Sequence, residues 1–468
     1  MLPKRELKIA SIRIILYLAP ITMYYIIYFS YVKMNCSIII SEWVNNILTI
    51  VLVALVSIIF VFFMKRVDII FNFSLLVLIT IFPISQQIIT GTPYSGAEYK
   101  GIFKISLFSL LILNAAIFLF FSKTKLYNSN KKLLSIYALL VFIILLASIM
   151  SEGFRSIAII VENFITPLGI MYIMLNLRID EIIHSLGILK IGIVINFILG
   201  LIEFITNKNI FESDLIELKK SMLISLNHIR SYGLVQHPLN YAFVGLVSIS
   251  IFIITRKRKD FAFVIIGIIM TIISISRAGI FLAIILGTVS LFILSKISEK
   301  KILTILLAIP YIFLVVIGAY IYFLKDKYDV YSKLSRIIAI QYFRTSFFSN
   351  LIVGYGLKQS MLADELSQMA KVNIIPENPT IILGSAYGYV FSLLLLFGLI
   401  FMISHIKDLY QRASCILLLI YLQTFNSYGT KYVYFNLFIY LIWLCILVGN
   451  VYSLKVQGKI EAKIPRGG

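Results

Sequence analysis

The chain has 468 residues, of which 60% are hydrophobic and 13% are charged, and its mean hydropathy is +0.98. Apolar runs of membrane-spanning length recur along the sequence, which excludes an ordinary soluble protein and indicates a polytopic membrane protein. The net charge of +21 does not indicate a nucleic-acid partner, because most Lys and Arg residues lie in short clusters between the apolar runs, where they set topology and contact lipid.

Windows of about 19 residues predict an all-α fold with about 14 transmembrane helices. These helices are expected to begin near residues 11, 44, 69, 102, 133, 156, 182, 239, 261, 278, 302, 380, 413 and 433. Basic clusters fall in every second connection, so the positive-inside rule predicts that these connections and both termini are cytoplasmic. Residues 1–468 are therefore expected to form a single membrane domain.

Two intramembrane acids lie toward the predicted outer face. Glu162 lies in the sixth predicted span, where Pro167 could break the helix, and Glu203 lies near the outer end of the seventh span. An acid at such a depth usually pairs with a base or lines a wet cavity. We therefore predict that both carboxylates support a site on this face, most simply by an ion pair with one of the arginines described next.

The two long connections, residues 207–238 and the larger 325–379, are both predicted on the outer face. The first ends in “RSYGLVQHPLNYA”, which contains Arg230, Tyr232 and His237. The turn “SISRAG” places Arg277 on the same face between two spans, and the second long connection contains Arg336.

Arginine suits phosphate, because its planar fork donates paired hydrogen bonds and stays charged. Arg230, Arg277 and Arg336 are thus predicted to bind a pyrophosphate at the membrane boundary. The alternative interpretation is that each arginine anchors its helix to lipid headgroups.

His237 and Glu377 are the candidate proton acceptors, because both lie in external segments close to where the chain enters the membrane. Each has a simpler interpretation: His237 precedes Pro238 and would suit a turn, and Glu377 could be a solvated loop acid. The sequence contains no HExxH, EF-hand, P-loop or Rossmann motif, and its three cysteines form no CxxC pair. We therefore expect no required metal and no cofactor.

The order of these segments carries a resemblance. “RSYGLVQHPLNYA”, then “SISRAG”, then an external loop with “RIIAIQYF”, “VGYG” and “ENPTIILGSAYGYV” resembles the family of bacterial O-antigen ligases and O-antigen or capsular polysaccharide polymerases. The resemblance covers residues 225–400. It implies a GT-C type fold and a metal-independent glycosyltransferase in the bacterial plasma membrane, with its active site on the outer face.

The implied partners are donor and acceptor oligosaccharides linked to undecaprenyl pyrophosphate, together with membrane lipids and, as a further option, a chain-length regulator protein. The family's arginines correspond to Arg230, Arg277 and Arg336. The ligases typically carry histidine followed by asparagine where this chain has Glu377 and Asn378, and this departure favours a polymerase with Glu377 as the base. A ligase acting on a lipid A core and a flippase without chemistry stay open as alternatives.

Overall fold

The computed structural model describes residues 67–80, 106–121, 131–152, 157–208, 210, 224–225, 228–235, 237–297, 311–312, 315–316, 318, 330–355, 368, 377–425, 427–429 and 433–448. Within these residues the protein is helical apart from one short antiparallel pair, β1 (Ile224–Ser225) and β2 (His228–Ile229). The predicted all-α class is therefore confirmed for the described chain. Both termini, the spans predicted near residues 11 and 44, and most of the span near 302 lie outside it.

Every predicted span that falls in the described residues has a helix beginning within a few residues of it. The α-helices are α3 (Val67–Thr80), α5 (Leu107–Phe121), α6 (Lys131–Glu152), α7 (Ile157–Ile160), α8 (Thr166–Asn176), α9 (Ile179–Thr206), α11 (Pro238–Thr255), α12 (Ala262–Ile273), α13 (Arg277–Ile297), α15 (Val330–Ser346), α17 (Pro379–Tyr387), α18 (Tyr389–Ser404), α19 (Leu409–Leu422) and α20 (Phe435–Leu447). Short helices η3 (Gly233–Val235), η4 (Arg258–Phe261) and η5 (Ser427–Gly429) lie between them.

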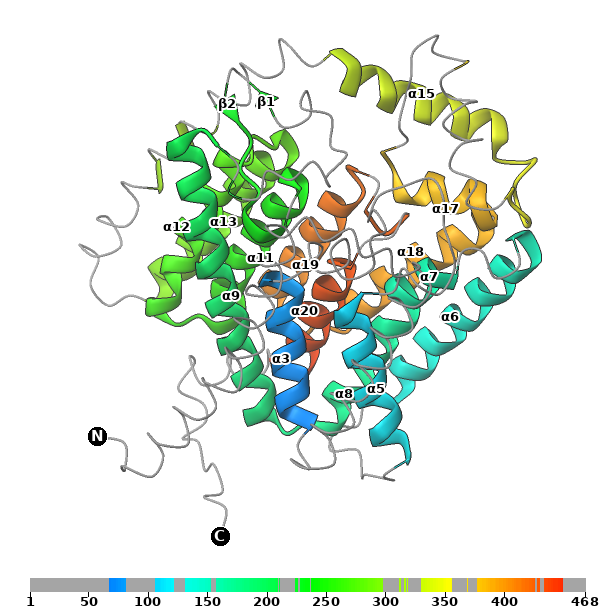
Figure 1. Ribbon diagram of the computed structural model, residues 1–468, viewed down its shortest axis with the longest axis horizontal. Coiled ribbons are helices and arrows are strands. Elements are labelled where there is room, and N and C mark those ends of the chain that lie inside the picture. Colours follow the sequence, from blue (N-terminus) through cyan, green and yellow to red (C-terminus); the bar gives the residue numbers. More distant parts are fainter. Residues whose placement is uncertain are drawn as a thin grey trace, which may run out of the picture.

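Four of these helices, α6, α9, α11 and α13, are long and apolar enough to cross a membrane. Shorter apolar helices, including α18, α19 and α20, accompany them. Figure 1 shows α11, α19 and α20 in the middle of the bundle, with α6 and α18 on one side and α9, α12 and α13 on the other. This arrangement supports the membrane protein that the composition predicts.

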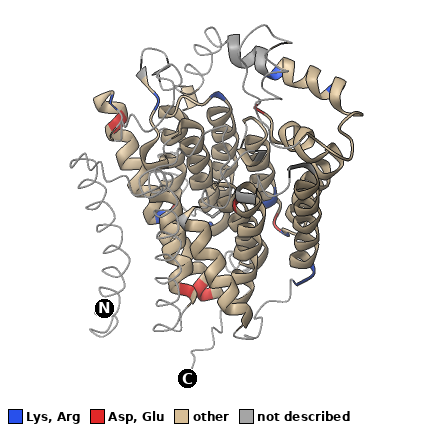
Figure 2. Cartoon of the chain, turned by 45° about the vertical axis from the view of Figure 1, so that its right-hand side comes forward, with Lys and Arg blue, Asp and Glu red and all other residues tan. Residues whose placement is uncertain are grey.

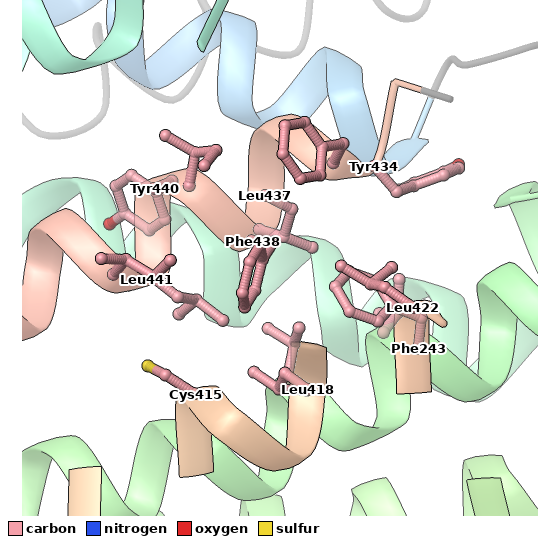
Figure 3. Close-up of a cluster of buried hydrophobic side chains, with 14 of the residues drawn as sticks. Phe243, Cys415, Leu418, Leu422, Tyr434, Leu437, Phe438, Tyr440 and Leu441 are labelled. Atoms are coloured by element: carbon pink, nitrogen blue, oxygen red, sulfur yellow. The ribbon is translucent and has the colours of Figure 1, made fainter. Parts of the chain in front are cut away.

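Side chains of α11, α19 and α20 form the middle of a core to which most of the other helices also contribute. The Phe438 side chain of α20 points toward Leu418 and Leu422 of α19 (Figure 3). On the other side of α11, Gly245 and Gly267 bring α11 and α12 into backbone contact, since a Cβ atom at Gly267 would lie 2.3 Å from the Gly245 carbonyl oxygen. Small residues at such a crossing let two membrane helices pack closely.

Pro167 does not break the sixth predicted helix. Between α7 and α8 the backbone instead forms a short π-helix, η2 (Val161–Ile165), and Pro167 lies in the first turn of α8. The Thr166 N–H and hydroxyl both donate to the Val161 carbonyl oxygen, so the helix continues with one wider turn. The adjacent Glu162 is thereby carried into the protein interior.

The bundle has two ends, and charged residues are sparse along the helices between them (Figure 2). At one end α11 leads into α12 and α19 begins, and Arg256 forms an ion pair with Asp408 there. The opposite end contains the start of α11, the start of α13 and the C-terminal end of α19. All of the predicted site residues except Glu162 belong to segments at or near this second end.

Candidate functional site

The end of the first long connection is fixed onto α9 by two buried side chains. The Glu203 carboxylate accepts the backbone N–H groups of Tyr232 at 2.8 Å and Gly233 at 2.9 Å. The Asn196 side-chain oxygen accepts the N–H of Leu234 at 3.0 Å. These bonds position the Arg230–Val235 segment at the second end of the bundle, and the Tyr232 side chain is buried.

The predicted ion pairs of the two intramembrane acids are wrong. Glu162 is fully buried and accepts hydrogen bonds from the Ser106 hydroxyl at 2.9 Å, the Ser109 hydroxyl at 2.7 Å and the Ser106 N–H. Glu203 accepts from backbone amides. Uncharged donors can satisfy a buried carboxylate as an ion pair would, and here they do so at both positions. Both acids are therefore satisfied by uncharged groups within the fold, and of the two only Glu203 lies at this end.

The “SISRAG” turn is strained and is held by the first loop. Ile275 has a φ of 51°, which is an outlier for a β-branched residue and costs about 1–3 kcal/mol. The Arg230 Nε donates to the Ser274 carbonyl oxygen at 3.0 Å, and the Ser231 N–H donates to the Ile273 carbonyl oxygen at 3.1 Å. The Arg230 guanidinium is thereby brought beside the turn that presents Arg277.

Arg277 is the first residue of α13, the helix that leaves this turn. Ser276 caps the helix, since its hydroxyl accepts the Gly279 N–H at 3.3 Å. A cation in the first turn is unfavourable, because the N-terminus of a helix already carries partial positive charge. An anion bound there would interact favourably with both the helix terminus and the guanidinium.

His237 caps the N-terminus of α11. Its Nδ1 accepts the Leu239 N–H at 3.2 Å, so the neutral ring carries its proton on Nε2 and can only donate from that atom. Burial, and secondarily the nearby positive charge of Arg230, lower the pKa of His237 to about 4. The turn interpretation is supported, and in this geometry the imidazole has no nitrogen available to accept a substrate proton.

Replacing His237 with asparagine should remove a pH dependence of stability. The folded pKa of about 4 lies below the ordinary value near 6.5, so the unfolded state binds the proton more tightly and the free energy of unfolding falls as the pH drops from 6.5 to 4. Asparagine is a preferred N-cap and does not titrate. Melting temperatures in detergent at a series of pH values should decline less for His237→Asn than for the parent. Equal declines of the melting temperature in the two proteins would show that His237 is not the source of this pH dependence.

The C-terminal end of α19 connects the two helix starts. The Tyr421 hydroxyl donates to the Leu239 carbonyl oxygen of α11 at 2.8 Å and lies 3.3 Å from the Ser276 hydroxyl at the start of α13. Tyr421 is fully buried. The helix starts next to His237 and Arg277 are thus held together by a residue far away in the sequence.

Arg336 and Glu377 contact each other. The Arg336 Nε lies 3.3 Å from the Glu377 Oε2, and the two side chains are partly exposed at 49% and 33%. The arginine belongs to α15 and the acid immediately precedes α17. A predicted phosphate ligand and a predicted base therefore form an ion pair.

Asn378 caps α17 and also fixes it to α19. The Asn378 side-chain oxygen accepts the Ile381 N–H at 3.1 Å, and its Nδ2 donates to the Gln423 carbonyl oxygen at 3.2 Å. The Thr380 hydroxyl donates to the Gln423 Oε1 at 2.9 Å. Since Tyr421 and Gln423 are two residues apart, one turn of α19 joins the Arg230, His237 and Arg277 segments to the Glu377 segment.

Sequence reasoning missed Tyr421 and Gln423. They lie in “LLLIYLQTF”, an apolar run in which neither residue is part of a motif. A polar side chain at the end of a predicted span is the one available signal, and it is shared by many interfacial residues.

In the part of the chain that the structure describes, no group of three or more His, Cys, Asp or Glu residues is placed to hold a metal ion. The chain matches no protein family, no curated protein and no solved structure.

Proposed function

We propose that the protein is a polysaccharide polymerase of the bacterial plasma membrane, with about 14 spans and a GT-C type architecture. It transfers a growing glycan from undecaprenyl pyrophosphate to the terminal sugar of another lipid-linked repeat unit at the outer face, while both termini are cytoplasmic. The proposal rests on the resemblance of the loop segments. The structural observation that supports it is that the Tyr421 hydroxyl contacts the starts of both α11, next to His237, and α13, next to Arg277.

In the proposed reaction an acceptor hydroxyl attacks the anomeric carbon of the donor as the Glu377 carboxylate takes its proton. The bond between that carbon and the phosphate oxygen breaks, and the pyrophosphate leaves with the bonding electrons. A single displacement inverts the configuration at the anomeric carbon. Arg277, with Arg230 beside it, stabilises the charge that develops on the leaving group.

The arrangement around Glu377 supports this division of roles. Arg336 contacts the carboxylate and holds it in place beside α17, and a carboxylate can accept a proton. His237 is a hydrogen-bond donor through Nε2, which suits a phosphate oxygen better than an acceptor hydroxyl. We therefore assign proton transfer to Glu377, and we place His237 with the arginines among the groups that bind the pyrophosphate.

The test is incubation of the purified protein with its lipid-linked repeat unit alone, with EDTA present, followed by gel separation of the glycans. A ladder of products is expected. Transfer only after a lipid A core is added would make the protein a ligase. Movement of the lipid-linked unit across a liposome bilayer without a new glycosidic bond would make it a flippase, and either result would overturn the polymerase.

A further inference from the structure

Helix α15 lies across the end of the bundle, whereas the neighbouring helices run along it, and this is seen in both views (Figures 1 and 2). Its C-terminal end is firmly attached. The Ser346 hydroxyl lies 3.0 Å from the Tyr389 hydroxyl, and the Tyr389 N–H donates to the Asn350 carbonyl oxygen at 2.9 Å. Gly388 permits this approach, since it has a φ of 106° and a Cβ atom there would lie 2.3 Å from the Ile352 carbonyl oxygen.

One face of this segment is packed and the other is exposed. Ile338, Ala339 and Tyr342 are buried, whereas Ile337, Ile340 and Phe348 are 54%, 59% and 82% exposed. Exposed side chains of this size are costly in water, and a cluster of them indicates a binding surface. The helix also contains Lys333, Arg336 and Arg344 and no acidic residue. At about 100° per residue, Arg344 lies between Ile337 and Ile340 on the exposed face, where its long side chain can reach headgroups while the isoleucines insert. Basic residues among exposed apolar ones on one helix are typical of a membrane surface.

The exposed apolar surface continues onto α18, one of the shorter apolar helices. Beyond Phe348 it passes through Ile352 and Val353, which are 63% and 51% exposed, and reaches Val390 at the start of α18. The Val390 N–H donates to the Leu351 carbonyl oxygen at 3.0 Å, so the two surfaces adjoin. Phe397, further along α18, is 61% exposed. The exposed face of α15 thus borders the exposed apolar side of α18.

We propose that α15 is an interfacial helix, with Ile337, Ile340 and Phe348 inserted among the lipids of the bilayer surface and its arginines in contact with anionic headgroups. Lipid is the favoured occupant because the exposed surface is continuous with that of α18 and the charged residues within α15 itself are all basic. The Arg336 edge of the same helix contacts Glu377, so the bilayer surface would hold one side of the candidate site in place. This inference does not depend on the catalytic proposal.

The test measures the depth of single spin labels in liposomes. Cysteines are introduced singly at Ile340 and at Thr345, which is also exposed and lies about 140° away around the helix at about 100° per residue. The background carries Cys36→Ser, and Cys415 and Cys445 are buried. Collision rates with oxygen, which concentrates in the bilayer, and with a water-soluble nickel chelate are compared. The oxygen-to-nickel ratio should be several-fold higher at Ile340→Cys than at Thr345→Cys.

Two further arms keep the outcome unambiguous. Anionic lipid should raise the ratio at Ile340→Cys relative to neutral lipid, and Ile337→Ser should lower it. Equal ratios at the two labelled positions would place the helix in water and overturn the proposal. Exclusion of both reagents at Ile340→Cys would mean that protein, such as a second copy of the chain, covers this face, and would overturn it equally. None of these readouts requires a glycan substrate.

Discussion

The Arg277→Ala variant should lose chain growth on the lipid-linked repeat unit by about 10²- to 10³-fold, the range typical of removing one preorganised group that stabilises developing charge. Arg277 begins α13, so its guanidinium and the helix N-terminus act on the same region. The strained Ile275 and the Ser276 cap fix the turn before chemistry begins. Little reorganisation is then needed when the leaving group becomes charged. The measurement is the initial rate of ladder formation by purified protein.

The controls separate loss of the charge from loss of the fold. Arg258→Ala removes an exposed arginine from the opposite end of the bundle and should leave the rate unchanged. Arg277→Lys keeps a charge without the planar fork and should recover part of the rate. Membrane insertion and the elution profile in detergent should match the parent in all three variants. Full activity of Arg277→Ala would remove the main support for the pyrophosphate assignment.

Hydropathy predicts the helices well because each membrane span must satisfy its own backbone and present apolar side chains. The described helices accordingly begin close to the predicted positions, from Val67 in α3 to Phe435 in α20. The hydropathy windows do not give the ends of the helices. Gly388 divides one predicted span into α17 and α18. In the sixth predicted span, where Pro167 was expected to break the helix, the π-helix η2 keeps the helix continuous.

The candidate site could be predicted only in part. The sequence predicts which residues lie in the connections between spans, but their partners are set by distant segments. Glu162 is satisfied by serines more than fifty positions earlier in the chain, and Glu203 by amides some thirty positions later. The contact between Arg336 and Glu377 spans forty-one positions. A single sequence contains no record of such pairings. This is why the Arg336–Glu377 ion pair was missed and why ion pairs were wrongly expected for Glu162 and Glu203.

Glu377→Gln should lower the rate of chain growth by about 10²- to 10⁴-fold, which is the usual contribution of a general base. The substitution keeps the shape of the side chain and removes its capacity to take a proton. The Arg336–Glu377 pair is partly exposed, and pairs of this kind contribute only about 0–1 kcal/mol to stability. The variant should therefore fold normally, and unchanged thermal stability in detergent would show that the loss is chemical.

The role of Arg336 follows from combining the two substitutions. If Arg336 acts by positioning Glu377, then Arg336→Ala should lower the rate of chain growth little further once Glu377→Gln is present, because the group it acts through is already disabled. If Arg336 binds the pyrophosphate independently, the two losses should multiply. Arg258→Ala, at the opposite end of the bundle, is the control for removing an exposed arginine. The observed pairing favours the first outcome, since a guanidinium facing a carboxylate has part of its donor capacity already occupied. The donor pyrophosphate would then be held chiefly by Arg230 and Arg277, and the Arg336 side of the site would belong to the acceptor.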